Sequence, residues 1–218
     1  MKIKICGLTR PEEANFINDN KVDYAGFVFY PPSKRNVTND QALEIMNKLS
    51  PEVKKVAVMV SPTVEDINNI KDLPFDVYQI HKNLDEAVIE ESNVPIWVAV
   101  NVSNEEEADK KLGYIDSLKD DNKVKIEAVV VDAPDFGSGK PFNWHKSKRL
   151  KKAGSQSPPD RMFILAGGLN PDNVAEGIEL FNPDVVDVSS GVEGECGKDE
   201  KKIIQFVEAV RNKEKTDE

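Results

Sequence analysis

Eight short apolar runs recur along the chain with amphipathic segments between them, and this alternation restricts the possible folds more than any other feature. The runs cover residues 3–6, 24–29, 55–60, 75–80, 96–100, 127–131, 162–166 and 185–188. Several are apolar at successive positions, as in Ala128-Val129-Val130-Val131, which is typical of strands buried on both faces. The pattern therefore predicts an α/β fold built on a parallel sheet.

The segments between the runs carry signals for helix starts. Thr9 precedes the first segment, and either Thr38 or Asn39 precedes the second. Thr63 precedes the third, and the pair 170–171 places proline at the first position of a later helix. Threonine and asparagine side chains cap the N-termini of helices, so these positions fit strands that alternate with helices.

A sheet of this kind is either open or closed. An open, doubly wound sheet usually has a glycine-rich G-x-G-x-x-G turn after its first strand, whereas the first strand here ends in Cys6-Gly7-Leu8. We therefore predict a closed (β/α)8 barrel, the TIM-barrel architecture, as a single domain over residues 1–211. Residues 212–218 are expected to form a polar tail, and residues 133–141 and 151–160 to be irregular loops.

Charge and cysteine usage restrict the partners and the compartment. The formal net charge of −10 argues against nucleic acid and against anionic membranes, because both would be repelled. It also means that an anionic ligand must be held by local donors. The two cysteines, the absence of a secretory pattern and the absence of a long apolar stretch predict a cytoplasmic protein. Closely spaced metal ligands and nucleotide-binding fingerprints are missing, so no metal and no cofactor are expected.

Reactive groups of such barrels lie at the carboxyl ends of the strands and in the loops that follow them. These positions carry a thiol, a guanidinium, an imidazole and a carboxylate, from Cys6, Arg35, His81 and Asp132. Each has a simpler explanation. Cys6 fits a small core residue, Asp132 a loop or cap residue, Arg35 a solvated side chain and His81 a hydrogen-bonded structural residue.

Two glycine-bearing turns follow the last two strands. They are Ala166-Gly167-Gly168-Leu169 and Ser189-Ser190-Gly191-Val192. Glycine allows backbone N–H groups to approach a ligand, and barrels often bind phosphate at this place. A tight turn alone would also use Gly-Gly, but two such turns on adjacent strands favour a phosphate site.

These residues belong to longer runs that together resemble the phosphoribosylanthranilate isomerases. The runs are 4–10, 26–29, 33–35, 77–81, 130–132, 137–144, 165–174, 187–193 and 197–199. They follow one another from the first strand to the last helix, so the resemblance covers nearly the whole chain.

The resemblance implies an isomerase that carries out an Amadori rearrangement of a phosphosugar in tryptophan biosynthesis. It implies that Cys6 is the general base, that Asp132 is the general acid, and that Arg35 holds the anthranilate carboxylate. The phosphate would bind at Gly167, Gly168, Ser190 and Gly191, and His81 is included among the substrate-binding residues. The substrate is a small phosphosugar, and the protein is expected to be a monomer or a homodimer.

The chemistry implied by the resemblance requires opposite pKa shifts. The pKa of Asp132 should be raised by its apolar strand end, and that of Cys6 lowered by nearby donors or positive charge. The sequence departs from the family pattern at Lys82, where glycine is usual, at residues 137–139, where Gly-Ser-Gly replaces Gly-Thr-Gly, and at residues 195–196. These departures leave Cys6 and Asp132 in place and concern the surrounding loops.

Two rival functions and one redox hypothesis remain. An indole-glycerol-phosphate synthase would call for lysines and a glutamate at strand ends, where Cys6 and Asp132 stand here. A catalytically silent phosphate-binding barrel is the rival from another class. Because barrel closure places the last strand beside the first, Cys196 is also expected to approach Cys6 and to form an inactivating disulfide under oxidation.

Overall fold

The computed structural model describes residues 1–101, 105–117, 126–132 and 161–217, and eight parallel strands form its centre. The strands are β1 (Lys2–Cys6), β2 (Tyr24–Phe29), β3 (Lys54–Val60), β4 (Val77–His81), β5 (Ile96–Asn101), β6 (Ile126–Asp132), β7 (Met162–Leu165) and β8 (Val185–Val188). Each of the eight apolar runs contributes to one of these strands. The predicted parallel sheet is therefore confirmed.

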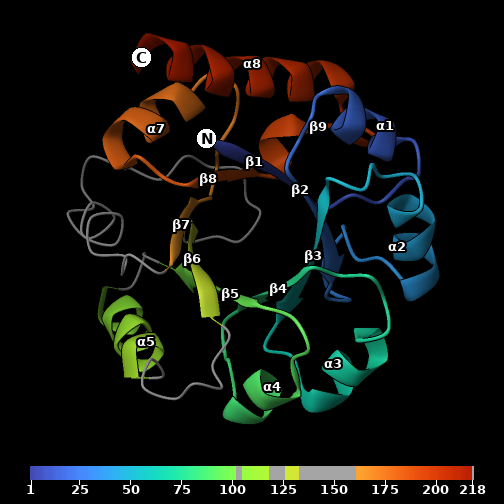
Figure 1. The fold of residues 1–218 in the computed structure, drawn as a ribbon, viewed down its shortest axis with the longest axis vertical. Helices are drawn as coiled ribbons and strands as arrows, with labels where there is room; N and C mark the ends of the chain where they lie inside the picture. Colours follow the sequence, from blue (N-terminus) through green and yellow to red (C-terminus); the bar gives the residue numbers. More distant parts are fainter. Residues whose placement is uncertain (102–104, 118–125, 133–160, 218) are drawn as a thin grey trace.

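The sheet closes on itself, because β1 pairs with both β2 and β8. In the closing pair Lys2 lies opposite Val185, and Lys4 lies opposite Asp187. Figure 1 shows the strands as a ring with the helices arranged around it. The prediction of a (β/α)8 barrel is confirmed, and all strand carboxyl ends consequently meet at one rim.

Helices follow the strands and cover the outside of the ring. They are α1 (Glu13–Asp19), α2 (Asn39–Met46), α3 (Val64–Ile70), α4 (Glu86–Glu91), α5 (Glu105–Ser117), α7 (Val174–Phe181) and α8 (Glu200–Asp217). Thr38 and Thr63 cap α2 and α3, and each forms a reciprocal capping box with the third residue of its helix. The predicted segments 133–141 and 151–160, including any helix between β6 and β7, lie outside the described residues.

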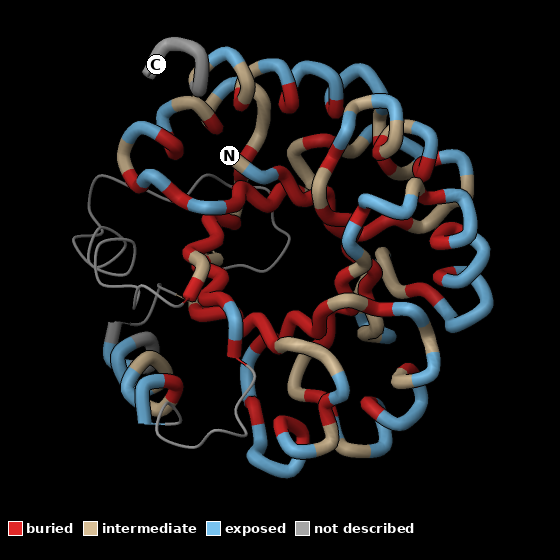
Figure 2. Tube along the Cα trace, in the orientation of Figure 1, coloured by how far each residue is buried: buried red, intermediate tan, exposed pale blue. Residues whose placement is uncertain are grey.

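Apolar side chains fill both sides of the ring of strands. Figure 2 shows the strands as almost continuously buried, and the helices as buried on the side that faces them. Inside the ring, the rings of Tyr24 and Trp97 meet edge to face with their centroids 4.9 Å apart. These residues lie on β2 and β5, which are not neighbours, so their contact crosses the barrel interior and fills it.

Six of the eight strands begin or end one or two residues away from the predicted run, and the largest differences are at β4 and at the C-terminal helix. The run expected at 75–80 forms β4 only from Val77. Phe75 lies before the strand, and its ring packs edge-on against those of Phe29 and Tyr78, which explains why an apolar residue stands there. Helix α8 continues to Asp217, so most of the predicted polar tail is helical. Lys213 in that segment pairs with Glu179 of α7 at 3.3 Å, and lysine and glutamate favour helices. No helix in the described ranges is both long and apolar enough to cross a membrane.

Candidate active site

A cavity of about 760 Å³ opens at the carboxyl ends of the strands. Cys6, His81 and Asp132 are the last residues of β1, β4 and β6, and all three side chains line it. The other predicted residues that line it are Arg35, Gly167, Gly168 and Ser190. Gly191 is not among the lining residues within the described part of the chain. Barrel closure thus brings seven of the eight predicted site residues to one cavity.

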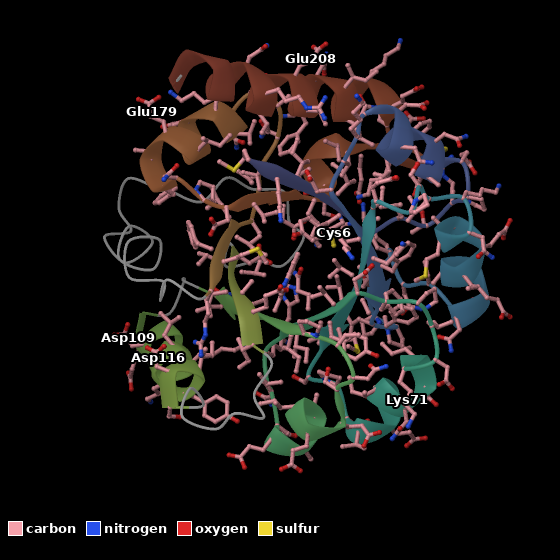
Figure 3. The ribbon with its side chains drawn as sticks, viewed as in Figure 1. Cys6, Lys71, Asp109, Asp116, Glu179 and Glu208 are labelled. Carbon is pink, nitrogen blue, oxygen red and sulfur yellow. The ribbon has the colours of Figure 1, made fainter. Side chains whose placement is uncertain are left out.

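Figure 3 shows Cys6 inside the ring of strands. Two charged groups outside the predicted site, Lys4 and Asp187, lie close to it. Lys4 precedes it by two residues and therefore faces the same side of β1. The Nζ atom of Lys4 donates to Oδ2 of Asp187 at 2.8 Å, and Lys4 is fully buried. The sequence signal for both residues was a charged side chain within an apolar strand, which is unfavourable without a partner.

The pKa of Cys6 corrects one expectation. Burial raises the pKa of the thiol, and the positive charges of Lys4 and Lys198 oppose this rise without cancelling it. The predicted lowering of the Cys6 pKa is therefore wrong for the ligand-free protein. The physical reason is that the strand end removes the sulfur from water, and that Asp187 adds a negative charge beside it. Cys6 and Cys196 are both free thiols, so the oxidative disulfide stays a prediction.

His81 and Asp132 lie together on the other side of the cavity. Nδ1 of His81 is 3.9 Å from Oδ2 of Asp132, and Nε2 of His81 is 3.0 Å from the amide nitrogen of Gln79. Burial, together with the charges of Lys4 and Lys111, lowers the pKa of His81 to about 3. The imidazole is therefore neutral near neutral pH. The side-chain amide of Gln79 holds Nε2, and Nδ1 lies on the side of Asp132.

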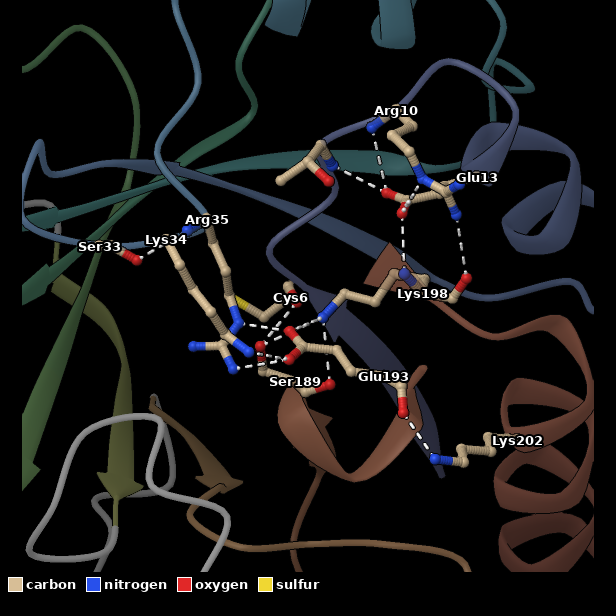
Figure 4. A network of polar contacts seen from close by, with 11 residues as sticks. Cys6, Arg10, Glu13, Ser33, Lys34, Arg35, Ser189, Glu193, Lys198 and Lys202 are labelled. Atoms are coloured by element: carbon tan, nitrogen blue, oxygen red, sulfur yellow. Dashed lines mark hydrogen bonds and ion pairs between the residues drawn. The ribbon is translucent and has the colours of Figure 1, made fainter. Parts of the chain in front are cut away.

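Arg35 belongs to a charged network at the rim (Figure 4). Glu193 begins β9 (Glu193–Gly194), which pairs with β10 (Gly197–Lys198) after the short helix η3 (Ser190–Val192). The Glu193 carboxylate accepts hydrogen bonds from Arg35, from Lys34 at 2.9 Å and from Lys198 at 2.9 Å. Three cations thus surround one carboxylate, which leaves local positive charge in a chain whose net charge is −10.

Glu193 remains ionised in this network. Burial alone would raise its pKa, but the hydrogen bond from Arg35 and the charge of Lys198 outweigh burial and lower the pKa to about 2. Sequence reasoning missed Glu193 and Lys198, because their importance arises from contact with Arg35, which lies 158 residues from Glu193 along the chain. Glu193 holds the guanidinium of Arg35, the group that is expected to bind a substrate carboxylate.

The turns after β7 and β8 expose backbone groups to the cavity at glycine residues. Gly167 and Gly168 have positive φ angles of 81° and 69°, which glycine adopts without strain. The side chain of Asn173 fixes this turn, since it donates to the carbonyl of Gly168 at 3.0 Å and accepts from the N–H of Asn170 at 2.8 Å. Ser190 opens η3 on the neighbouring strand end and lines the cavity beside these glycines.

Gly191 is required by packing, and its replacement should be costly. A Cβ atom at Gly191 would lie 2.0 Å from the carbonyl oxygen of Leu169 and 2.9 Å from Cα of Asn170. Because both are backbone atoms, we expect Gly191→Ala to lower the free energy of unfolding by about 2 kcal/mol. Urea denaturation followed by circular dichroism measures this change.

Gly113→Ala is the matched control for that substitution. A Cβ atom at Gly113, on the exposed side of α5, would meet nothing within 4 Å. Removing a glycine from a helix interior is expected to stabilise the protein by about 0.5–1 kcal/mol. A Gly191→Ala protein as stable as the parent would contradict the packing argument.

Lys82 follows His81 with a φ angle of +58°, a left-handed conformation that a residue with a Cβ atom adopts at a cost of about 1–2 kcal/mol. This is the position at which the family resemblance calls for glycine. We expect Lys82→Gly to raise the free energy of unfolding by about 1 kcal/mol, because relief of this strain exceeds the added entropy of the unfolded chain. Thermal and urea unfolding measure the change.

Lys48→Gly is the control, since Lys48 is an equally exposed lysine that is not among the residues with positive φ. That substitution should destabilise the protein. If both glycine variants lost stability to the same extent, Lys82 would not be strained.

The described residues contain no cluster of three or more side chains of the types that hold a metal ion. The lining therefore offers general acid–base groups, a cationic rim and a glycine-rich backbone corner. These groups suit an anionic ligand that undergoes proton transfer.

Comparison with known proteins identifies the family of the chain. The family model described as N-(5′-phosphoribosyl)anthranilate (PRA) isomerase matches residues 3–209. An N-(5′-phosphoribosyl)anthranilate isomerase from Streptococcus mutans is 40% identical over 211 residues, which is 96% of this chain and 98% of that protein.

Two solved structures extend the comparison. A phosphoribosyl anthranilate isomerase in complex with reduced 1-(o-carboxyphenylamino)-1-deoxyribulose 5-phosphate is 30% identical, with a TM-score of 0.79, and the match covers 97% of this chain and 99% of that one. A structure of monomers generated from the dimeric enzyme of Thermotoga maritima is also 30% identical, with a TM-score of 0.77 and coverages of 97% and 98%. The chain therefore belongs to the N-(5′-phosphoribosyl)anthranilate isomerase family.

Proposed function

We propose that this chain converts N-(5′-phosphoribosyl)anthranilate into 1-(2-carboxyphenylamino)-1-deoxyribulose 5-phosphate, as the isomerase of L-tryptophan biosynthesis. The observation that carries the proposal is that Cys6 and Asp132 line one cavity together with Arg35 and the glycine turns. A substrate that carries both a carboxylate and a phosphate matches the guanidinium and the backbone turns. The family membership supports the same assignment.

Asp132 acts first in this mechanism. In its protonated form it donates a proton to the ring oxygen of the ribose, the bond between that oxygen and C1′ breaks, and the anthranilate nitrogen forms a Schiff base with C1′. Asp132 is left as a carboxylate, with its Oδ2 atom 3.9 Å from Nδ1 of His81. A neutral, buried imidazole in this place stabilises the carboxylate without competing for its proton.

Cys6 acts second. Its thiolate removes the proton from C2′, and the electron pair of that C–H bond forms the double bond of an enolamine, which tautomerises to the ketone product. Substrate and product are isomers, so the steps are proton transfers within one bound molecule. Arg35 and the turns at Gly167, Gly168 and Ser190 hold the two anionic ends and thereby fix C2′ near the sulfur.

The experiment is an assay with freshly made phosphoribosylanthranilate, in which the loss of substrate fluorescence is followed in time. Chromatography separates the rearranged product from anthranilate released by hydrolysis. We expect rapid conversion to the ketose that depends on protein concentration. Fluorescence loss no faster than in buffer would overturn the proposal and favour a silent phosphate-binding barrel.

The proposal includes the compartment and the oligomeric state in which the chain acts. The substrate is a small soluble phosphosugar, and we propose that the chain acts on it in the cytoplasm. The Thermotoga maritima relative is described as dimeric, and this chain is proposed to work as a monomer or as a homodimer. Size-exclusion chromatography with light scattering separates these two states.

A further inference from the structure

Lys4 and Cys6 share a small space inside the barrel. They lie two residues apart on β1, and the space beside them is left open by Gly26 of β2, which pairs with Cys6. A Cβ atom at Gly26 would be 3.0 Å from Sγ of Cys6 and 3.2 Å from Nζ of Lys4. The sulfur and the ammonium group therefore border the same position.

The hydrogen-bonding capacity of the buried Lys4–Asp187 ion pair is not used up by the hydrogen bond between the two residues. An ammonium group has three hydrogens, and the hydrogen bond to Oδ2 of Asp187 uses one of them. The other carboxylate oxygen, Oδ1, is buried and has no hydrogen-bond partner among the described residues. Such a pair is often no more stabilising than apolar residues of similar volume, so its stability alone does not explain it.

The other charged groups around Cys6 are already engaged. Lys198 of β10 donates to the carbonyl and the hydroxyl of Ser189 and to Glu193. Arg35 is paired with Glu193, and the carboxylate of Asp132 lies beside the neutral His81 across the cavity. Lys4 is the neighbouring cation that retains donor hydrogens next to the sulfur.

We propose that Lys4 is the counter-ion of the Cys6 thiolate. Asp187 weakens this interaction by binding the ammonium group of Lys4 when the thiol is protonated. When the S–H proton leaves to solvent, Lys4 directs its hydrogens to the sulfur. Lys4 is then a positioning residue, because it acts on C2′ through Cys6. The inference rests on the proposed role of Cys6 as the base.

The electrostatic effects of the two partners have opposite signs. After burial, which raises the pKa of Cys6, the charge of Lys4 is the largest influence and lowers it, whereas Asp187 raises it. In turn, burial works against the charged form of Lys4, but Asp187 and Cys6 outweigh burial and raise its pKa. An ion pair whose charges did not act on the sulfur would leave the pKa of the thiol unchanged when its members are removed in turn.

The test measures the thiol directly and needs no substrate. In a Cys196→Ser background, which removes the exposed thiol, the rate of Cys6 alkylation by iodoacetamide is followed against pH by intact-protein mass spectrometry. We expect Lys4→Met to raise the midpoint of this curve by about one pH unit or more, and Asp187→Asn to lower it. The double variant Lys4→Met/Asp187→Asn should lie between the parent and Lys4→Met.

Two controls separate this effect from damage to the fold. Lys2→Met removes an exposed lysine from the same face of β1 and should leave the midpoint unchanged. Removal of one buried charge can prevent folding, but the double variant leaves no unpaired charge, and it decides the question if a single variant does not fold. The proposal is overturned if folded Lys4→Met has the same midpoint as the parent, or if Asp187→Asn has a higher one. If Lys4→Met does not fold, an unchanged midpoint in the double variant overturns it instead.

The alkylation curve and the turnover assay test the counter-ion and the proposed function separately. A protein that isomerises the substrate but whose thiol ignores Lys4 would refute the counter-ion alone. A thiol that responds as expected in a protein without isomerase activity would refute the proposed function alone.

Discussion

Replacing Asp132 by asparagine should lower kcat by about 10³-fold while leaving ligand affinity nearly unchanged. Asparagine keeps the shape of the side chain at the end of β6 and its place in the cavity lining. Its amide cannot give a proton to the ribose ring oxygen, so the ring stays closed. Steady-state turnover gives kcat, and calorimetry with the reduced product that a relative binds gives the affinity.

Asp40→Asn is the matched control for this substitution. Asp40 is exposed in the first turn of α2, so its replacement makes the same chemical change away from the cavity. This variant should turn over substrate like the parent. If Asp132→Asn kept more than a tenth of parental kcat, another group would have to be the acid, and His81, which shares this side of the cavity, would be tested next.

Replacing Cys6 by serine should also lower kcat by about 10³-fold, because near neutral pH a hydroxyl is ionised far less than a thiol. The burial that raises the pKa of the Cys6 thiol would act on a serine hydroxyl too, since both would occupy the same strand end. Binding of the reduced product should be retained, because the two side chains differ little in size. Single-turnover measurements with excess enzyme isolate this chemical step from product release.

Cys196→Ser tests whether the effect belongs to this thiol. Cys196 is exposed in the turn between β9 and β10, and its replacement should leave kcat unchanged. The same variant removes the possibility of a disulfide with Cys6, so oxidative inactivation that persists in it would rule out that linkage. Substantial turnover by Cys6→Ser would point to a different base.

The raised pKa of Cys6 has a consequence for the pH dependence of turnover. Only the thiolate takes a proton from C2′, so kcat/KM should increase with pH until the thiol of the free enzyme is ionised.

The barrel and the positions of the principal reactive groups are predictable from local sequence patterns. Eight apolar runs of strand length alternate with capped helical segments, and buried parallel strands require such runs. Once the runs are placed in a barrel, Cys6, His81 and Asp132 must lie at one rim, because parallel strands all end on the same side. The roles of these residues came from the family resemblance.

The contacts and charges of these groups follow from the folded chain. The partner of Lys4 lies 183 residues away, and the two meet because β8 pairs with β1. Glu193 reaches Arg35 through the hairpin after η3, a segment without a periodic pattern. Local patterns report burial and backbone preference, whereas a pKa depends on which charges meet in three dimensions. The sign of the Cys6 shift was therefore missed although its position was predicted.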